Sequence, residues 1–234
     1  MDWTGATNTP DFKHNATLNV YGAYTGIAGM TNSGNNSYLI FRNNSQTVNI
    51  TFGAAFAGTH INFGSDSGVN LGNWTLLDTL VISLNQIAFY AGTLNTNGQI
   101  INCRNFLISL AHTKVLTTGA SIINCSGTAG TGFDYTGTNL TLTANTATIN
   151  ISGTGTFTGG GITTYHDVNL NGTAHTISGS NTFNSFNLAS GVTQTIKFTD
   201  GTTQTATTYE LSGSAGHVHT LQGTGAAGWY LTKV

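Results

Sequence analysis

The stretch QIINC at residues 99–103 returns as SIINC at residues 121–125, with LNTNG before the first copy and LTTGA before the second. Repeats with periods of about 20–50 residues are typical of stacked structural units. In a parallel β-solenoid, successive turns stack at the spacing between neighbouring strands, about 4.8 Å. The second copy should therefore lie directly over the first. The predicted stacked pairs are Ile101 with Ile123, Asn102 with Asn124, and Cys103 with Cys125.

Other segments repeat at comparable distances. LVISL at 80–84 returns as FLISL at 106–110, and NLTLTANTATI at 139–149 is echoed at 167–177 and 185–196. Short alternating runs bounded by Gly, Asn and Ser indicate strands, and no window shows the helical spacing of apolar residues. The sequence therefore predicts an all-β fold, a right-handed parallel β-solenoid (β-helix).

An antiparallel sandwich is the alternative architecture. It would join strands by tight hairpins about 8–12 residues apart, and Asn97-Gly98 and Asp200-Gly201 are suitable turns. Such hairpins do not explain why similar strands return at longer distances, so we favour the solenoid, with a few antiparallel strands allowed at its C-terminal end. The expected organisation is an N-terminal cap over 1–45, solenoid coils over 46–197 and a C-terminal β cap over 198–234.

The chain is unusually poor in charge. Charged residues make up 6% of the 234 residues, against about 25% in ordinary globular domains. The net charge is −2 and the six Lys and Arg residues are scattered, whereas nucleic-acid binding requires a clustered basic footprint. No apolar run approaches the length of a membrane span, and MDWTGATNTPDF at the start lacks the features of a signal peptide. We therefore expect neither nucleic-acid binding nor membrane insertion.

Two segments, LLDTLVISL at 76–84 and QIINCRNFLISL at 99–110, are apolar on both faces. Consecutive strand residues point to opposite faces, so Ile100 and Ile101 cannot both point inward. Strands that are apolar on both faces are normally covered on both faces. Something should therefore lie against the outside of the solenoid near residues 76–125.

The cover could be the N-terminal segment with Trp3 and Phe12, or a second copy of the chain. The low charge favours a second copy, because soluble monomers usually carry more surface charge. We therefore expect a homo-oligomer, and analogy with trimeric β-helical spikes favours a trimer. The candidate contact residues are Ile100, Ile101 and Leu107.

Cysteine and histidine offer two candidate sites. Stacked on neighbouring turns, Cys103 and Cys125 would lie within the Cα distance of a disulfide; we favour an interior ladder of reduced side chains. His217 and His219 share one face of a short predicted strand. Three such pairs near the axis of a trimer could bind a transition metal. We favour the alternative that they are ordinary surface residues of an exposed strand, and we expect no metal and no cofactor.

An enzyme acting on polysaccharides is one alternative function. Glycoside hydrolysis uses two carboxylates about 5–9.5 Å apart, and only stacking of distant turns could pair the sparse acidic residues here. We take Asp134 and Asp167 as the carboxylates to test. GSDSGVNLG at 64–72 faintly suggests a Ca²⁺ turn without further carboxylates. The eight acidic residues are Asp2, Asp11, Asp66, Asp78, Asp134, Asp167, Asp200 and Glu210.

Ice binding is the other alternative function. Several Thr-x-Thr units occur between residues 138 and 159. Regular outward Thr ladders on a flat solenoid face are the device of ice-binding β-solenoids, although Asn residues interrupt the pattern here.

The stretch at 186–234 resembles a module of large bacterial surface proteins and of phage and prophage structural proteins. The shared features are apolar-x-Leu, Thr-Ile-x-Phe, Gly-x-Thr-Gln-Thr, Leu-x-Gly-x-x-Gly, Thr-Leu and a late Trp. DWTGATNT at 2–9 is similar to the Trp-x-Gly start of those chains. His217 and His219 depart from the pattern, because such modules more often carry apolar or Asn residues there.

This resemblance covers about a quarter of the chain and contains no catalytic signature. It implies a β-solenoid building block exposed on a virion or extracellular surface. The expected function is that of a non-enzymatic structural or adhesive protein, a phage virion appendage or bacterial surface module. Its partners would be other virion or surface proteins, or glycans.

Overall fold

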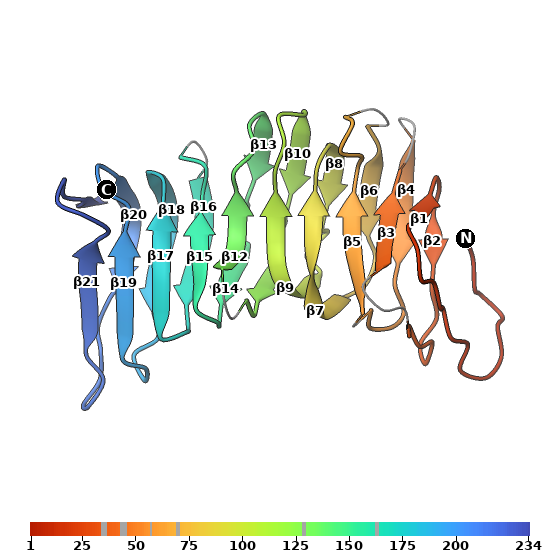
Figure 1. Ribbon diagram of the computed structural model, residues 1–234, viewed down its shortest axis with the longest axis horizontal. Coiled ribbons are helices and arrows are strands. Elements are labelled where there is room, and N and C mark those ends of the chain that lie inside the picture. Colours follow the sequence, from red (N-terminus) through yellow and green to blue (C-terminus); the bar gives the residue numbers. More distant parts are fainter. Residues whose placement is uncertain (34–36, 43–45, 57, 69–70, 128–129, 162–163) are drawn as a thin grey trace.

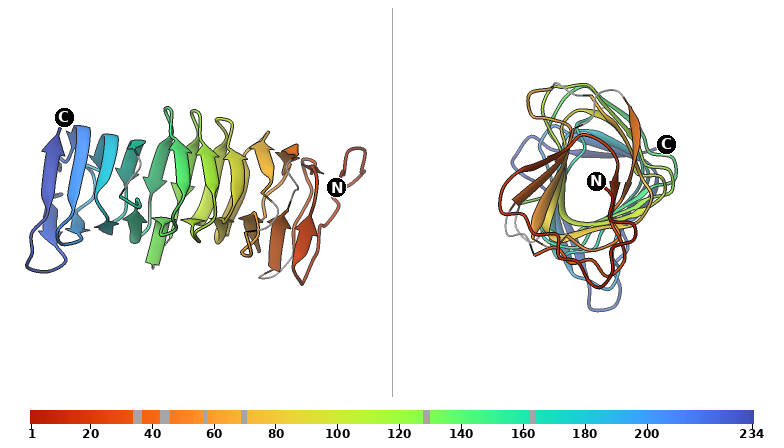
Figure 2. Two further views of the ribbon diagram at one scale, coloured as in Figure 1. Left: turned by 90° about the horizontal axis from the view of Figure 1, so that it is seen from above. Right: turned by 90° about the vertical axis from the view of Figure 1, so that its right-hand side faces the viewer.

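The computed structural model describes residues 1–33, 37–42, 46–56, 58–68, 71–127, 130–161 and 164–234. These residues form a β-solenoid of about nine turns, with parallel strands and no helix. The N-terminus lies at one end of the stack and the C-terminus at the other (Figure 1). Seen along the axis, the turns follow one closed contour (Figure 2, right). The predicted all-β parallel solenoid is confirmed. No helix in the described ranges could cross a membrane.

Most of the strands stack in three columns, which we name A, B and C. Column A contains β2 (Tyr24–Thr25), β4 (Thr47–Thr51), β6 (Asn73–Leu76), β8 (Gly92–Asn95), β10 (Lys114–Thr117) and β13 (Leu140–Thr143). Column B contains the first halves of β7 (Leu80–Phe89) and β9 (Ile100–Ile108), then β11 (Ile122–Cys125) and β14 (Thr148–Ile151), and then the second halves of β16 (Thr164–Leu170), β18 (Asn181–Leu188) and β20 (Thr203–Glu210).

Column C is the longest of the three. It contains β1 (Leu18–Val20), β3 (Ser37–Phe41), β5 (Thr59–Phe63), the second halves of β7 and β9, β12 (Gly130–Tyr135), β15 (Gly155–Thr158), β17 (Ala174–Ser178), β19 (Gln194–Phe198) and β21 (His219–Gly223). The last strand, β22 (Tyr230–Lys233), pairs with the first half of β20. Strands therefore stack within 1–45 and 198–234 as well as between them.

The register of the opening repeat is as predicted. β9 and β11 pair with Ile101 opposite Ile123, Asn102 opposite Asn124, and Cys103 opposite Cys125. In the second half, β16 and β18 pair Val168 with Phe186 and Leu170 with Leu188. Their common apolar-Asn-Leu pattern therefore marks one position of column B.

Two of the proposed repeats were placed wrongly. LVISL at 80–84 pairs with the IINC copy, because Leu80 lies opposite Ile101, while Phe106 of FLISL lies opposite Ile87. Likewise 140–143 belongs to column A, and it is 148–151 that stacks on 167–170. The reason is that all three columns need the same alternation of apolar residues, so a similar run can occupy a different column.

The antiparallel strands allowed at the C-terminal end are not found. β19 pairs with β21 and β20 with β22 in parallel, and within the described ranges the one antiparallel bridge joins Ser214 and His217. The turn at Asp200-Gly201 leads the chain from β19 of column C into the first half of β20 instead of folding a strand back on its neighbour. A tight turn signal therefore marks a corner of the solenoid here.

Side chains fill the inside of the stack. Phe106, Phe133 and Phe157 of column C lie one above another, with ring centroids 5.6 and 5.5 Å apart and nearly parallel planes. At the N-terminal end, Phe12 is buried against the rings of Tyr24 and Phe56. The N-terminal segment therefore caps the first turns, and its aromatic contacts do not extend to residues 76–125.

The corners between columns B and C are very tight. A Cβ atom on Gly172 would lie 2.1 Å from the carbonyl oxygen of Gly153, and one on Gly153 would lie 1.7 Å from that of Gly127. Backbone therefore packs directly on backbone at this corner, where only glycine leaves enough room.

Candidate functional site

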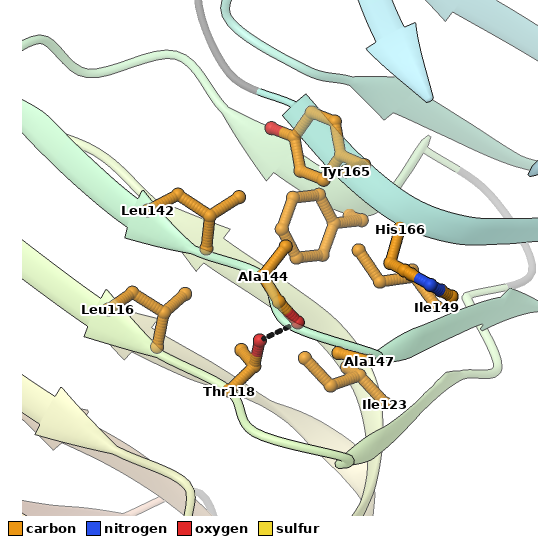
Figure 3. Close-up of a pocket in the computed structure, with 10 residues that line it drawn as sticks. Leu116, Thr118, Ile123, Leu142, Ala144, Ala147, Ile149, Tyr165 and His166 are labelled. Atoms are coloured by element: carbon orange, nitrogen blue, oxygen red, sulfur yellow. Dashed lines mark hydrogen bonds between the residues drawn. The ribbon is translucent and has the colours of Figure 1, made fainter. Parts of the chain in front are cut away.

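In the part of the chain that the structure describes, the enclosed pocket with the best definition is too small for an organic ligand. The best-enclosed pocket lies where column A ends at β13, between Leu142 and Tyr165, and its lining is apolar (Figure 3). Its free volume is about 10 Å³, which is at most the space of one water molecule. The Tyr165 hydroxyl donates a hydrogen bond to the carbonyl oxygen of Gly159 (2.9 Å). We therefore look for candidate sites on the outer faces of the solenoid.

A buried lysine serves the structure. Lys114 points into the stack and is fully buried. Its Nζ donates hydrogen bonds to the carbonyl oxygens of Leu110 (2.7 Å), His112 (2.8 Å) and Thr138 (2.9 Å). Burial lowers the pKa of this ammonium group. The side chain ties the loop between β9 and β10 to the next turn.

The outer face of column B carries a ladder of asparagines. From Asn124 onward, each amide Nδ2 donates to the Oδ1 of the asparagine one turn earlier, at 2.7–2.8 Å. The five members of this Asn ladder are Asn102, Asn124, Asn150, Asn169 and Asn187. Their hydrogen bonds are made largely to each other, so the ladder stabilises the stack and is a poor candidate for ligand binding.

The candidate contact residues lie on different sides of the wall. Ile101 is 1% exposed in the core, whereas Ile100 is 40% exposed on the outer face of column B. Ile122, directly above Ile100, is 38% exposed. Leu107 is half-buried on the outer face of column C, between Ala88 and Asp134. Of the two consecutive isoleucines, Ile100 is thus the one that a second copy could cover.

We expect Ile100→Asp to dissociate an oligomer without unfolding the solenoid. The substitution would remove the apolar contact that Ile100 makes with a second copy. Burial of apolar surface stabilises association by about 25 cal/mol per Å². Ile101→Asp should instead unfold the chain, because it puts an unpaired charge into the core. Sedimentation velocity and circular dichroism separate these outcomes, and a wild-type protein that sediments as a monomer at micromolar concentration would contradict the prediction.

The two cysteines are free and buried, with their Sγ atoms 3.9 Å apart. The hydrogen bond that the Cys103 thiol shares with Cys125, together with burial, raises the pKa of Cys103. A buried thiol with a raised pKa is a poor nucleophile. This arrangement is the interior ladder that the sequence favoured.

His217 and His219 flank Val218, which is 72% exposed. His219 begins β21 and both histidines are half-buried. Across the described ranges, no three His, Cys, Asp or Glu side chains gather closely enough to hold a metal ion. A metal site here would need ligands from further chains, so it stays a prediction about an oligomer.

Several carboxylates are used to hold corners. Asp78 accepts from the backbone N–H of Phe52 (2.8 Å) and Gly53 (2.6 Å). Asp200 accepts from those of Ala227 (2.9 Å) and Gly225 (2.8 Å), and these bonds hold its pKa below the usual value. Hydrogen bonds, first of all from the Ser33 side chain, likewise lower the pKa of Asp11. A lowered pKa makes Asp11 and Asp200 unsuited to general acid catalysis.

Asp134 and Asp167 are not brought together. Asp134 is buried in column C between Leu107 and Thr158, and burial raises its pKa. Asp167 lies in column B beside His166, 3.0 Å from its Nδ1, with Thr148 and Ser185 on the neighbouring turns. Neither has a carboxylate at the adjacent position of its own column. Of the suggested Ca²⁺ turn, Val69 and Asn70 lie outside the described residues.

A buried histidine holds the corner at 171–174. His175 is 3% exposed, and its Nε2 accepts from the backbone N–H of Gly172 (3.0 Å). Its Nδ1 lies 3.1 Å from the carbonyl oxygen of Gly155 and therefore carries the proton. This arrangement requires the neutral imidazole, and burial lowers the pKa of His175.

We expect this histidine to make the protein less stable in acid. Below about pH 6.5, the ordinary pKa of histidine, the His175 imidazole is protonated in the unfolded chain but stays neutral in the native state. The free energy of unfolding should therefore fall with decreasing pH until the lowered native pKa is reached, by up to about 1.4 kcal/mol per pH unit. Urea unfolding between pH 5 and 7.5 measures the slope. An equal slope in His175→Leu would refute the assignment.

The outer face of column A carries two neighbouring ranks of small polar residues. One rank runs Thr47, Asn73, Thr93, Val115, Thr141, and the other runs Asn49, Thr75, Asn95, Thr117, Thr143. The end positions are exposed, and the middle ones are half-buried by their neighbours. No charge interrupts the ten positions, which gives a regular array of methyl, hydroxyl and amide groups.

The outer face of column C is hollowed near the N-terminal end. An open cavity of about 350 Å³ lies there, between Tyr38, Arg42, Asn62, Asp66 and Tyr90. Gly64, which follows β5, lies between Arg42 and Tyr90 on the neighbouring turns and is part of the lining of the hollow. We call this feature the aromatic groove. Sequence reasoning missed it; the signal was the outward Tyr at 38 and 90.

Comparisons of the chain with protein-family models, curated proteins and solved structures give no match. The class that the geometry defines is a parallel β-solenoid with a solid interior. The function is therefore argued from the chemistry of its outer faces.

Proposed function

We propose that the chain is a non-enzymatic structural or adhesive β-solenoid, part of a phage virion appendage or of a bacterial surface protein. The observation that supports this most is the use of the acidic residues. Asp11, Asp78 and Asp200 hold corners through hydrogen bonds, and Asp134 and Asp167 lie in different columns. A catalytic pair is thus not assembled from these five.

The rod form suits such a role. Every turn bonds to the turn before it, so the chain forms a rod that can act as a stiff spacer (Figure 2). Apolar residues such as Ile100 and Ile122 on the outer face of column B suit contact with further copies, and we favour a trimer. The partners would be other virion or surface proteins, or glycans, on a virion or extracellular surface.

The test combines turnover with location. The full chain is incubated with a panel of bacterial polysaccharides, and new reducing ends or unsaturated sugars are measured; we expect none. Turnover that Asp134→Asn or Asp167→Asn abolishes would overturn the proposal. An antibody against the chain should label phage particles or the surface of bacterial cells in electron micrographs, and labelling confined to the cytoplasm would contradict it.

Ice binding is a second candidate, supported by the two ranks on column A. Stacked strands repeat at about 4.8 Å, so the Thr and Asn groups present an ordered lattice to water. Thermal hysteresis tests the idea directly. Activity should fall strongly in Thr93→Tyr or Thr117→Tyr and persist in Thr176→Tyr, which changes column C. Absence of hysteresis in the wild-type protein would exclude this function.

A further inference from the structure

We propose that the aromatic groove binds a neutral saccharide unit. This inference rests on the proposed adhesive function and gives it a site and a ligand class. The groove is an open hollow of about 350 Å³ on the outer face of column C. That volume is near the lower end of small-molecule sites, which span about 300–1,000 Å³, and suits one or two sugar rings.

Aromatic rings line the groove. Tyr38 is 39% exposed and stacks on the ring of His60 one turn later, with centroids 4.8 Å apart and planes 18° from parallel. This stacking fixes the Tyr38 ring. Tyr90, half-buried, comes from the turn after that. Fixed rings offer large apolar contact area at low entropic cost, together with a polar hydroxyl, which matches the mixed character of a sugar ring.

Two buried polar atoms in the groove lack partners. Within the described residues, the Oδ1 of Asn62 and the Nε of Arg42 make no hydrogen bond, and Asn62 is only 5% exposed. An unsatisfied buried polar group costs about 1–3 kcal/mol. One of these atoms accepts and the other donates, and a sugar hydroxyl can do both. A bound saccharide would therefore satisfy atoms that the fold leaves unpaired.

The charges favour a neutral ligand. Arg42 and Asp66 both line the groove, so its formal charges cancel. A phosphate or uronic acid would gain from Arg42 but would be repelled by Asp66. The hydroxyl groups of a neutral hexose can accept hydrogen bonds from Arg42 and donate them to Asp66. Both bonds would be charge-assisted and therefore stronger than bonds between neutral groups.

The experiment uses the full chain on an array of neutral and acidic oligosaccharides, followed by calorimetric titration with the neutral sugar that binds best. Tyr90→Ala and Arg42→Met should each weaken binding at least tenfold. Tyr230→Ala, a matched loss of an exposed ring at the opposite end of the stack, should leave the affinity unchanged. Thermal melts of each variant show whether it is folded, and Tyr38→Ala provides an independent change on the groove surface.

Four results would overturn the inference: no binding to any neutral sugar, preference for acidic sugars, unchanged affinity in all three groove variants, or a comparable loss of affinity in Tyr230→Ala. Two further results distinguish failure of the groove from failure of the proposed function. If the wild-type chain binds bacterial cells and the groove variants bind them equally well, adhesion stands and the groove is wrong. If the bound sugar is cleaved, the groove stands and the non-enzymatic role is wrong.

Discussion

Gly172→Ala is expected to lower the free energy of unfolding by about 3 kcal/mol or more. The added Cβ would lie 2.1 Å from the carbonyl oxygen of Gly153. Overpacking costs about 1–3 kcal/mol where side chains can adjust, but here the obstacle is backbone held by the turn below. Urea unfolding followed by circular dichroism measures the change.

Gly191→Ala is the matched control. Gly191 lies in the equivalent corner one turn later, and a Cβ there would meet no atom within 4 Å. The same substitution should be neutral or slightly stabilising, because it reduces the freedom of the unfolded chain. An equal loss of stability in both variants would show that the close stacking of Gly172 on Gly153 is not the cause.

Phe133→Ala should lower the free energy of unfolding by about 3–5 kcal/mol, the usual cost of removing a buried phenylalanine. Its ring lies between those of Phe106 and Phe157 and meets Tyr165 edge-on, with centroids 5.8 Å apart. The cavity left behind could close only if neighbouring turns moved. Chemical denaturation gives the loss.

Leu84→Ala serves as the control for Phe133→Ala. Leu84 is 65% exposed, and exposed substitutions usually change stability by less than about 0.5 kcal/mol. A cost below about 1 kcal/mol for Phe133→Ala would mean that the Phe stack contributes little to the cohesion of the turns.

The sequence allowed the period and one register to be predicted, because IINC occurs twice with its lead-in intact. Asn and Ile in those copies lie where they were expected. The remaining turns differ by inserts of variable length at the corners, and local patterns do not say which column a strand joins. For this reason LVISL was matched to FLISL, although Leu80 lies opposite Ile101.

The candidate site was less accessible to sequence reasoning. Tyr38, Asn62 and Tyr90 are far apart in the chain, and only the register of β3, β5 and β7 brings them to one face. By contrast, strand alternation alone requires that one of Ile100 and Ile101 points outward. The structure shows that the outward residue is Ile100.

The Asn ladder also bears on how such a chain emerges from the ribosome. Each amide bonds to the one before it, and each strand to a strand formed earlier: Asn124 needs only Asn102, and Asn150 needs only Asn124. A repeat array of this kind gains its stability from nearest neighbours. Every finished turn can therefore template the next during synthesis, and a nascent chain could begin to fold long before its last residues exist.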